Sequence, residues 1–310
     1  MTTLLGVLVV AAGGLLMGSG AWPLKLMRKY QFEHWWFVGM LVGLVVMPWA
    51  ITLAGCPRPL DSLRNVPLEA ILLGNLFAVG WGIANVLCGI CYVRIGVAMT
   101  GAILAGLGVS VGAITPMIFK GSGLFKNAPD LTSPAGLTVC AAVGLMLIGV
   151  VLASIAGFGR DRQLEKQQQG SGSFLSGLVM TVAAGILSSF MAFAFVYSQD
   201  PIVANLSVVE PGGDVAVTVD GVERLSGSYA VAQDGFLERP GVGRVEVGGL
   251  SAWDAGERIA QRVESQSGRP ARVLVQTGSV PATFGVFAVG LLGEALVNLG
   301  YAAWLMHRNR

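Results

Sequence analysis

Seven segments of this chain are each long and apolar enough to cross a lipid bilayer, and this feature limits the fold more than any other. A membrane-spanning helix needs about 20 residues at a rise of about 1.5 Å per residue, and each segment approaches or exceeds that length. The sequence therefore predicts an all-α polytopic membrane protein with about seven transmembrane helices. The segments cover residues 3–22, 35–54, 70–92, 96–119, 135–158, 174–197 and 282–306.

The composition argues against several other classes of protein. Hydrophobic residues make up 54% of the chain and charged residues only 12%, whereas soluble domains carry roughly 25% charged residues. The net charge of +2 and the lack of a basic patch argue against nucleic-acid binding. We recognise no phosphate loop, metal cluster or nucleophile elbow. The sequence therefore predicts no catalytic residue, metal or cofactor, and an enzyme is the least favoured class.

Basic residues in the loops indicate which ends of the helices face the cytoplasm. Nine lie on one side of the membrane and four in the short loops of the other. The positive-inside rule assigns the richer side to the cytoplasm, which places the N-terminus outside and the C-terminus inside. The nine are Lys25, Arg28, Lys29, Arg94, Arg160, Arg162, Lys166, Arg308 and Arg310, and the four are Arg58, Arg64, Lys120 and Lys126.

Residues 198–281 differ in character from the rest of the chain. They are polar, contain no spanning run, and alternate apolar with polar residues at Val215–Val219 and Arg272–Gln276, which predicts half-buried strands. Ser251 is placed to cap a helix that begins at Ala252. We predict a small α+β extramembrane domain at 198–281, between a six-helix region at 1–197 and a seventh helix with a short tail at 282–310. The charge count places this domain outside.

The first and sixth apolar segments share a sequence pattern. Val10-Ala-Ala-Gly-Gly-Leu15 and Val182-Ala-Ala-Gly-Ile-Leu187 match at five of six positions with an offset of 172 residues. The sixth segment follows five spans, an odd number, so the second copy runs in the opposite direction to the first. The pattern favours a partial inverted repeat, which is typical of secondary transporters that bind substrate near the midplane. Coincidental packing of small residues is the alternative.

The apolar segments resemble those of the L-rhamnose–proton symporter family, within the drug/metabolite transporter superfamily. The resemblance rests on Trp22-Pro-Leu-Lys25, Pro48-Trp-Ala50, Trp81-Gly-Ile-Ala-Asn85 and Asn298-Leu-Gly300, which occur in the family's order. It implies uptake of a rhamnose-like sugar driven by protons. Members of the family have ten helices and no large domain before the seventh, so we expect a homo-oligomer or a separate three-helix subunit to complete the bundle.

The polar domain resembles the periplasmic domain of polysaccharide export proteins. The motifs are Glu210-Pro-Gly-Gly-Asp214, Leu225-Ser-Gly-Ser-Tyr-Ala-Val231, Pro240-Gly-Val-Gly243 and Val245-Glu-Val-Gly-Gly-Leu250, in that order. This resemblance implies a carbohydrate context and an envelope with a periplasm. The protein is therefore expected in a bacterial inner membrane, with residues 198–281 in the periplasm.

One acidic residue lies near the middle of an apolar segment and is the candidate for proton coupling. Charge at membrane depth costs roughly 2.5–3.5 kcal/mol, so such a residue is a functional hypothesis by default. Asn298 and Tyr301 follow Glu294 by four and seven residues, so the three share one helical face. A hydrogen-bonded Glu with a purely structural role, or a contact to a partner helix, is the alternative.

A second polar stripe is the candidate for sugar binding. Trp81, Asn85, Cys88 and Tyr92 fall on one face of the third segment, where an aromatic ring can stack on a sugar and an amide can bond its hydroxyls. Interhelical hydrogen bonding is an equal alternative. Asn75 lies on another face and ranks lower. Lys25 could line the pore mouth, although a side chain that snorkels to the membrane interface is the commoner case.

Two functions follow from these features. The first is a proton-coupled carbohydrate transporter in the inner membrane, with Trp81, Asn85, Tyr92, Asn298 and Tyr301 as candidate substrate contacts. The second is a non-transporting membrane component of polysaccharide export or envelope assembly. The expected partners are a sugar or polysaccharide, protons and membrane lipid, and no nucleic acid.

Overall fold

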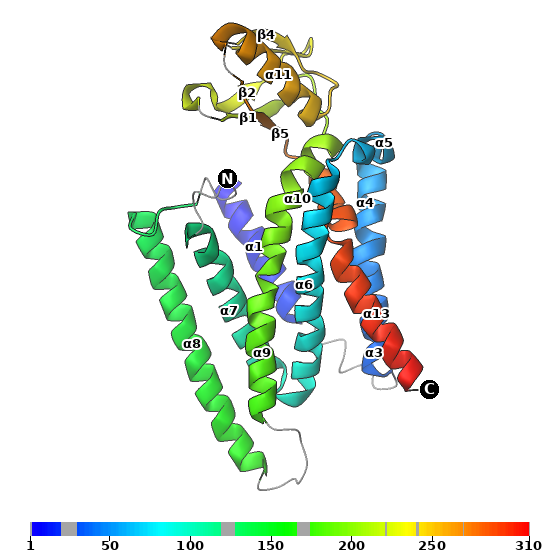
Figure 1. The fold of residues 1–310 in the computed structure, drawn as a ribbon, viewed down its shortest axis with the longest axis vertical. Coiled ribbons are helices and arrows are strands. Elements are labelled where there is room, and N and C mark those ends of the chain that lie inside the picture. The colour runs from blue at the N-terminus through cyan, green and yellow to red at the C-terminus, as the bar shows by residue number, and fades with distance from the viewer. Residues whose placement is uncertain are drawn as a thin grey trace.

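The computed structural model describes residues 2–19, 30–118, 128–165, 174–220, 222–239, 242–268 and 270–309. Figure 1 shows long helices side by side in one bundle, with a small strand-containing domain at one end. The N-terminus lies at the end of the bundle that carries this domain, and the C-terminus lies at the opposite end. The predicted fold class, a polytopic helical membrane protein with a small α+β domain, is confirmed.

All seven predicted apolar segments are helical over most of the residues that the structure describes in them. Five are continuous helical spans, and a bent pair makes a sixth among the described residues. The remaining segment, α1, is apolar from Leu4 to Leu16 and is shorter than a full span. The bounds are α1 Thr2–Ser19, α3 Phe32–Met40 with η1 Leu41–Val46 and α4 Met47–Gly55, α6 Leu68–Arg94, α7 Val97–Ile118, α8 Pro134–Glu165, α9 Phe174–Ser188 with α10 Phe190–Leu206, and α12 Val280–Gly285 with η3 Val286–Gly290 and α13 Leu292–Arg308; a short helix, α5 Pro59–Arg64, precedes α6.

The bundle is organised around α6, which packs against α9, α10 and α13. Helix α13 also packs against α3, so that the second and seventh segments meet near the C-terminus. There the Asn309 side-chain amide donates to Glu33 Oε1 at 2.7 Å. Helices α7, α8 and α9 form the other side of the bundle. The described side chains of α1 are exposed, including Leu4, Leu8 and Leu15.

The extramembrane domain is a three-stranded antiparallel sheet, a hairpin and one helix. The sheet has the order β2-β1-β5, and the hairpin pairs β3 with β4. The predicted alternation is confirmed in β1, where Val215, Val217 and Val219 are buried and the residues between them are exposed. The bounds are β1 Asp214–Val219, η2 Glu223–Leu225, β2 Gly227–Ala230, β3 Phe236–Arg239, β4 Gly243–Glu246, α11 Ala252–Ser267 and β5 Val273–Gln276.

Helix α11 begins where the sequence indicates. Ser251 has extended backbone angles, and its Oγ accepts a hydrogen bond from the backbone N–H of Asp254 at 3.0 Å. This contact satisfies one of the donors that a helix leaves unpaired in its first turn. The predicted cap is therefore confirmed. The helix lays its apolar face, including Ile259 and Val263, on β5 and into the core of the domain.

On its N-terminal side the extramembrane domain connects to the bundle without a linker, whereas residues 277–279 join β5 to α12 on its C-terminal side. Helix α10 continues to Leu206, nine residues beyond the expected end of its segment at residue 197. Ala204, in its last turn, is part of the apolar core of the domain. The backbone N–H of Ala252 then donates to Ser207 O at 2.9 Å, and that of Val209 donates to Leu250 O at 2.9 Å. The end of α10 therefore belongs structurally to both parts of the molecule.

Candidate functional site

The seventh segment is not one helix. Its first part, Val280–Gly290, meets α13 at an angle of 54°. The break is at Leu291, whose backbone angles of φ −119° and ψ 18° are not helical. The preceding turn is a π-helix over Val286–Gly290. A break of this kind frees backbone polar groups, and in lipid each of them needs a partner.

Asn75 of α6 supplies the partners at the break. Its Nδ2 donates to Val289 O at 2.8 Å, and its Oδ1 accepts from the backbone N–H of Gly293 at 2.7 Å. In a regular α-helix the N–H of residue 293 would bond directly to the carbonyl of residue 289. The Asn75 amide therefore stands between the donor and the acceptor of one backbone hydrogen bond of the helix. This role of Asn75 was not predicted from the sequence, where Asn75 ranked below the polar residues on the other face of its helix.

Glu294 lies in the first turn of α13, directly after the break, and its side chain is only 1% exposed. Its Oε1 accepts a hydrogen bond from Asn85 Nδ2 of α6 at 2.5 Å. Its Oε2 is buried and has no hydrogen-bond partner among the described residues. The start of a helix favours negative charge because its unpaired N–H groups and its dipole point there. The carboxyl group is thus held at one oxygen and left open at the other.

Gly82 allows the two helices to approach at this point. A Cβ atom at Gly82 would stand 3.0 Å from Glu294 Cα and 3.1 Å from Glu294 O. Distances of this kind are too close for ordinary packing, so a larger residue would push α13 away from α6. Gly82 therefore sets the separation at which Asn85 reaches Glu294.

Asn298 and Trp36 extend the polar group toward α3. Asn298 is fully buried, and its Nδ2 donates to Glu294 O at 3.0 Å. Its Oδ1 accepts from Trp36 Nε1 at 3.1 Å. The sequence analysis used Trp36 in no site, although a buried indole N–H needs an acceptor and so carried a signal. We call Asn85, Glu294, Asn298 and Trp36 the buried polar cluster.

The other candidate residues lie outside this cluster. Trp81 packs against Ala78, Ala194 and Leu291 in an apolar group. Tyr301 stacks on Trp304, with ring centroids 6.0 Å apart. Tyr92 contacts Cys88 of its own helix. Lys25 lies outside the described residues. The structure therefore brings together Asn85, Glu294 and Asn298 from two predicted stripes, and places the aromatic members elsewhere.

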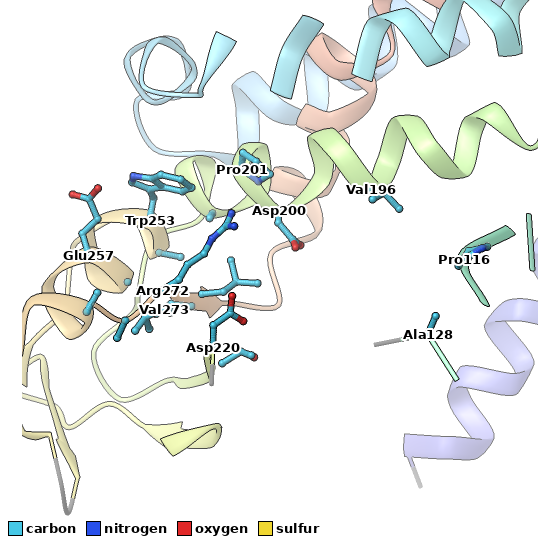
Figure 2. Close-up of a pocket in the computed structure, with 18 residues that line it drawn as sticks. Pro116, Ala128, Val196, Asp200, Pro201, Asp220, Trp253, Glu257, Arg272 and Val273 are labelled. Carbon is cyan, nitrogen blue, oxygen red and sulfur yellow. The ribbon is translucent and has the colours of Figure 1, made fainter. Parts of the chain in front are cut away.

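A cavity of about 800 Å³ lies at the junction between the bundle and the extramembrane domain. Trp253 and Glu257 of α11, Arg272 before β5, Asp220 after β1 and Asp200 of α10 line it (Figure 2). Pro116 of α7 and Ala128 lie across from them. We call this the junction pocket. None of its residues was predicted as a site from the sequence, because they come from α7, α10, α11, β1, β5 and the connections between elements.

Comparison with known proteins finds two families along the chain. Residues 2–212 match the model described as L-rhamnose-proton symport protein (RhaT). Residues 203–277 match the model described as polysaccharide biosynthesis/export protein. The two matches overlap over 203–212, the stretch that contains the end of α10. Both resemblances predicted from the sequence are thus confirmed.

The individual relatives have low sequence identity to this chain. The L-rhamnose-proton symporter of Yersinia pestis bv. Antiqua (strain Antiqua) is 28% identical over 172 residues, which cover 56% of this chain and 49% of the relative. The symporter of Yersinia pseudotuberculosis serotype O:3 (strain YPIII) is 28% identical over 172 residues and is covered to 48%. The chain thus spans about half the length of these relatives. No solved structure matches it.

Proposed function

We propose a function from one premise: the chain belongs to the L-rhamnose-proton symport protein family, whose model matches most of its length. The family is one of symporters, which are transporters and not enzymes. The proposed function is proton-coupled movement of a rhamnose-like sugar across a bacterial inner membrane.

The observation that carries the proposal is the contact between Asn85 and Glu294. A buried carboxyl group in a membrane helix is a candidate proton carrier, since it can be neutral when protonated and charged when it has a partner. Oε2 of Glu294 has no partner among the described residues, so it is the oxygen that we assign to the proton. The helix break beside it also fits a transport site, because broken helices line substrate sites in many transporters.

Sugar contacts are proposed around the same cluster. Asn85 and Asn298 offer amide groups that can bond hydroxyls once the present contacts rearrange. Trp81, Tyr92 and Tyr301 stay as candidate contacts along α6 and α13, and Lys25 stays the candidate for the pore mouth. The packing of Trp81 and Tyr301 against apolar and aromatic neighbours ranks them below the two amides.

We propose that the extramembrane domain is periplasmic and the C-terminus cytoplasmic. The N-terminus lies at the end of the bundle that carries this domain, and the C-terminus lies at the other end (Figure 1), as the charge count requires. A membrane-impermeant maleimide should label a Ser228→Cys variant in cells whose outer membrane has been opened. Labelling only after the inner membrane is broken would reverse the assignment.

A helical partner is part of the proposal. The described apolar side chains of α1 are exposed, and either lipid or another helix can cover them. A second copy of the chain or a separate three-helix subunit is the proposed partner. A Leu8→Cys variant tests this, because a neighbouring helix would allow its thiol to form a cross-link to another protein chain. If the thiol reacts only with lipid-soluble reagents and forms no such cross-link, lipid alone covers α1.

The transport proposal is tested in proteoliposomes that contain the purified chain, with labelled L-rhamnose outside and an inward proton gradient. We expect the gradient to accelerate uptake, and Glu294→Gln to abolish that acceleration. Glu69→Gln is the matched control, because Glu69 is exposed at the start of α6. Gradient-driven uptake that persists in Glu294→Gln would remove Glu294 from the coupling role.

The second proposed function is a membrane component of polysaccharide export or envelope assembly that transports nothing itself. One observation favours it: Ala204 of α10 is built into the core of the polysaccharide-export-like domain, so the bundle could serve as its anchor. Co-purification with envelope polysaccharide, without uptake of L-rhamnose in proteoliposomes, would favour this function over transport.

A further inference from the structure

The junction pocket carries a mixture of hydrogen-bonding groups that few ligands can satisfy. Asp200 and Glu257 present carboxylates, which only accept hydrogen bonds when ionised, and Asp200 Oδ1 also accepts from Gln276 Nε2 at 3.4 Å. Asp220 adds a third carboxylate to the lining. Arg272 presents a guanidinium, which only donates. Figure 2 shows the Arg272 side chain extending into the pocket between Trp253 and Asp220. A ligand that fills this space must therefore donate hydrogen bonds to the carboxylates and accept them from the Arg272 guanidinium.

Hydroxyl groups meet this requirement, because each of them both donates and accepts. A sugar carries several hydroxyls on one small ring, and its C–H face can pack on an aromatic ring. Trp253 is half-buried and lines the pocket, and so offers such a ring. The cavity of about 800 Å³ falls within the range of roughly 300–1,000 Å³ that is typical of small-molecule sites.

The charge of the lining limits the class of sugar. Three carboxylates and one guanidinium give the pocket a net negative charge, which disfavours uronic acids and sugar phosphates. A cationic ligand would gain from the carboxylates and from the indole, but it would meet the positive charge of Arg272. A neutral sugar is repelled neither by the carboxylates, as an anion would be, nor by Arg272, as a cation would be.

We infer that the junction pocket is a binding site for a neutral sugar unit, separate from the buried polar cluster and independent of whether the bundle transports. The site joins two parts of the chain, since Asp200 belongs to α10 and Trp253 to the extramembrane domain. A bound sugar would contact the bundle and the domain at once.

The test is calorimetric titration of the full-length chain in detergent with L-rhamnose and D-galactose as neutral sugars, D-glucuronate as an acidic sugar and choline as a cation. We expect saturable binding of at least one neutral sugar in the millimolar range, and about tenfold weaker or no binding of glucuronate and choline. Tighter binding of glucuronate or choline, or no saturation by either neutral sugar at about 100 mM, would overturn the inference.

Substitutions of pocket residues test whether the heat of sugar binding comes from the junction pocket. Trp253→Ala should weaken binding about five- to tenfold, and Glu257→Gln should also weaken it. Glu264→Gln is the matched control, because Glu264 is exposed on the same helix and does not line the pocket. If Trp253→Ala does not fold, Trp253→Phe keeps most of the packing and should still weaken binding.

A further variant distinguishes sugar binding in the junction pocket from sugar binding at the buried polar cluster. Glu294→Gln should leave the binding that depends on Trp253 unchanged. If instead Trp253→Ala and Glu257→Gln bind as the unaltered chain does while Glu294→Gln loses binding, the sugar occupies the bundle. In that case the junction site is refuted and the transport proposal stands.

Discussion

Asn75 Oδ1 accepts a hydrogen bond from the backbone N–H of Gly293 at 2.7 Å, although 218 residues separate the two. The contact replaces a bond that α13 would otherwise make within its own segment. It ties the start of α13 to α6, and the same two helices meet again at Asn85 and Glu294. The position of the buried carboxyl group therefore depends on a residue that does not touch it.

We expect Asn75→Ala to destabilise the protein by roughly 1–3 kcal/mol for each backbone group left without a partner. The affected groups are the carbonyl of Val289 and the N–H of Gly293. Thermal unfolding in detergent measures the effect. Asn65→Ala is the control, because Asn65 is exposed at the end of a short surface helix. Equal unfolding midpoints for the two variants would contradict the bridging role.

Asn85→Ala should lower gradient-driven sugar uptake by about tenfold or more, which corresponds to roughly 1.4 kcal/mol. The reason is that Oε1 of Glu294 loses its donor and the buried carboxyl group loses its orientation. Asn205→Ala is the comparison, since Nδ2 of that buried residue donates to Pro201 O of its own helix at 2.8 Å. If both variants keep full uptake with the proton gradient, the Asn85 contact is not part of coupling.

Gly82→Ala should separate α6 from α13 and reduce both stability and uptake. The new Cβ would lie 3.0 Å from Glu294 Cα, and overpacking of this kind typically costs about 1–3 kcal/mol. Gly39→Ala is the matched control, because a Cβ at Gly39 would meet nothing within 4 Å. Unfolding midpoints and initial uptake rates report the two effects. If Gly82→Ala changes neither the unfolding midpoint nor the uptake rate, then α6 and α13 can accommodate the added methyl group at this position.

Ser251→Ala should destabilise helix α11 by about 1 kcal/mol, because the variant loses the side-chain acceptor for the N–H of Asp254. Hydrogen exchange of the α11 amides in the full chain measures this locally. Ser228→Ala, at an exposed position of β2, should leave the same amides unchanged. Faster exchange in both variants alike would point to a general loss of stability and not to the cap.

The length and apolar character of the segments predicted the helices, alternation predicted the two strands at Val215–Val219 and Arg272–Gln276, and helical spacing predicted the face shared by Glu294 and Asn298. These features follow from local spacing, which a sequence displays directly. The pairing of Asn85 with Glu294 was not predicted, although each residue was named, because it depends on how α6 lies against α13. Trp81 and Tyr301 were predicted to share these faces as sugar contacts, whereas in the structure the Trp81 ring packs in an apolar group and the Tyr301 ring stacks on Trp304.

The break at Leu291 had no clear local signal. No proline lies within the segment after Pro281, and the residues at the break, Leu291 and Leu292, both favour helices. The two glycines beside them, Gly290 and Gly293, were the only local hint. The cause is an amide from another helix, and side-chain insertion into a helical ladder can be recognised only once the two helices are placed.

The shared end of α10 makes the molecule a mechanical unit. Ala204 is packed into the core of the extramembrane domain, and two turns earlier Tyr197 stacks on Phe77 of α6 with ring centroids 5.4 Å apart. A force applied to the extramembrane domain would thus be transmitted along α10 to α6, the helix that carries Asn75 and Asn85. There is no slack chain in that path to absorb the load.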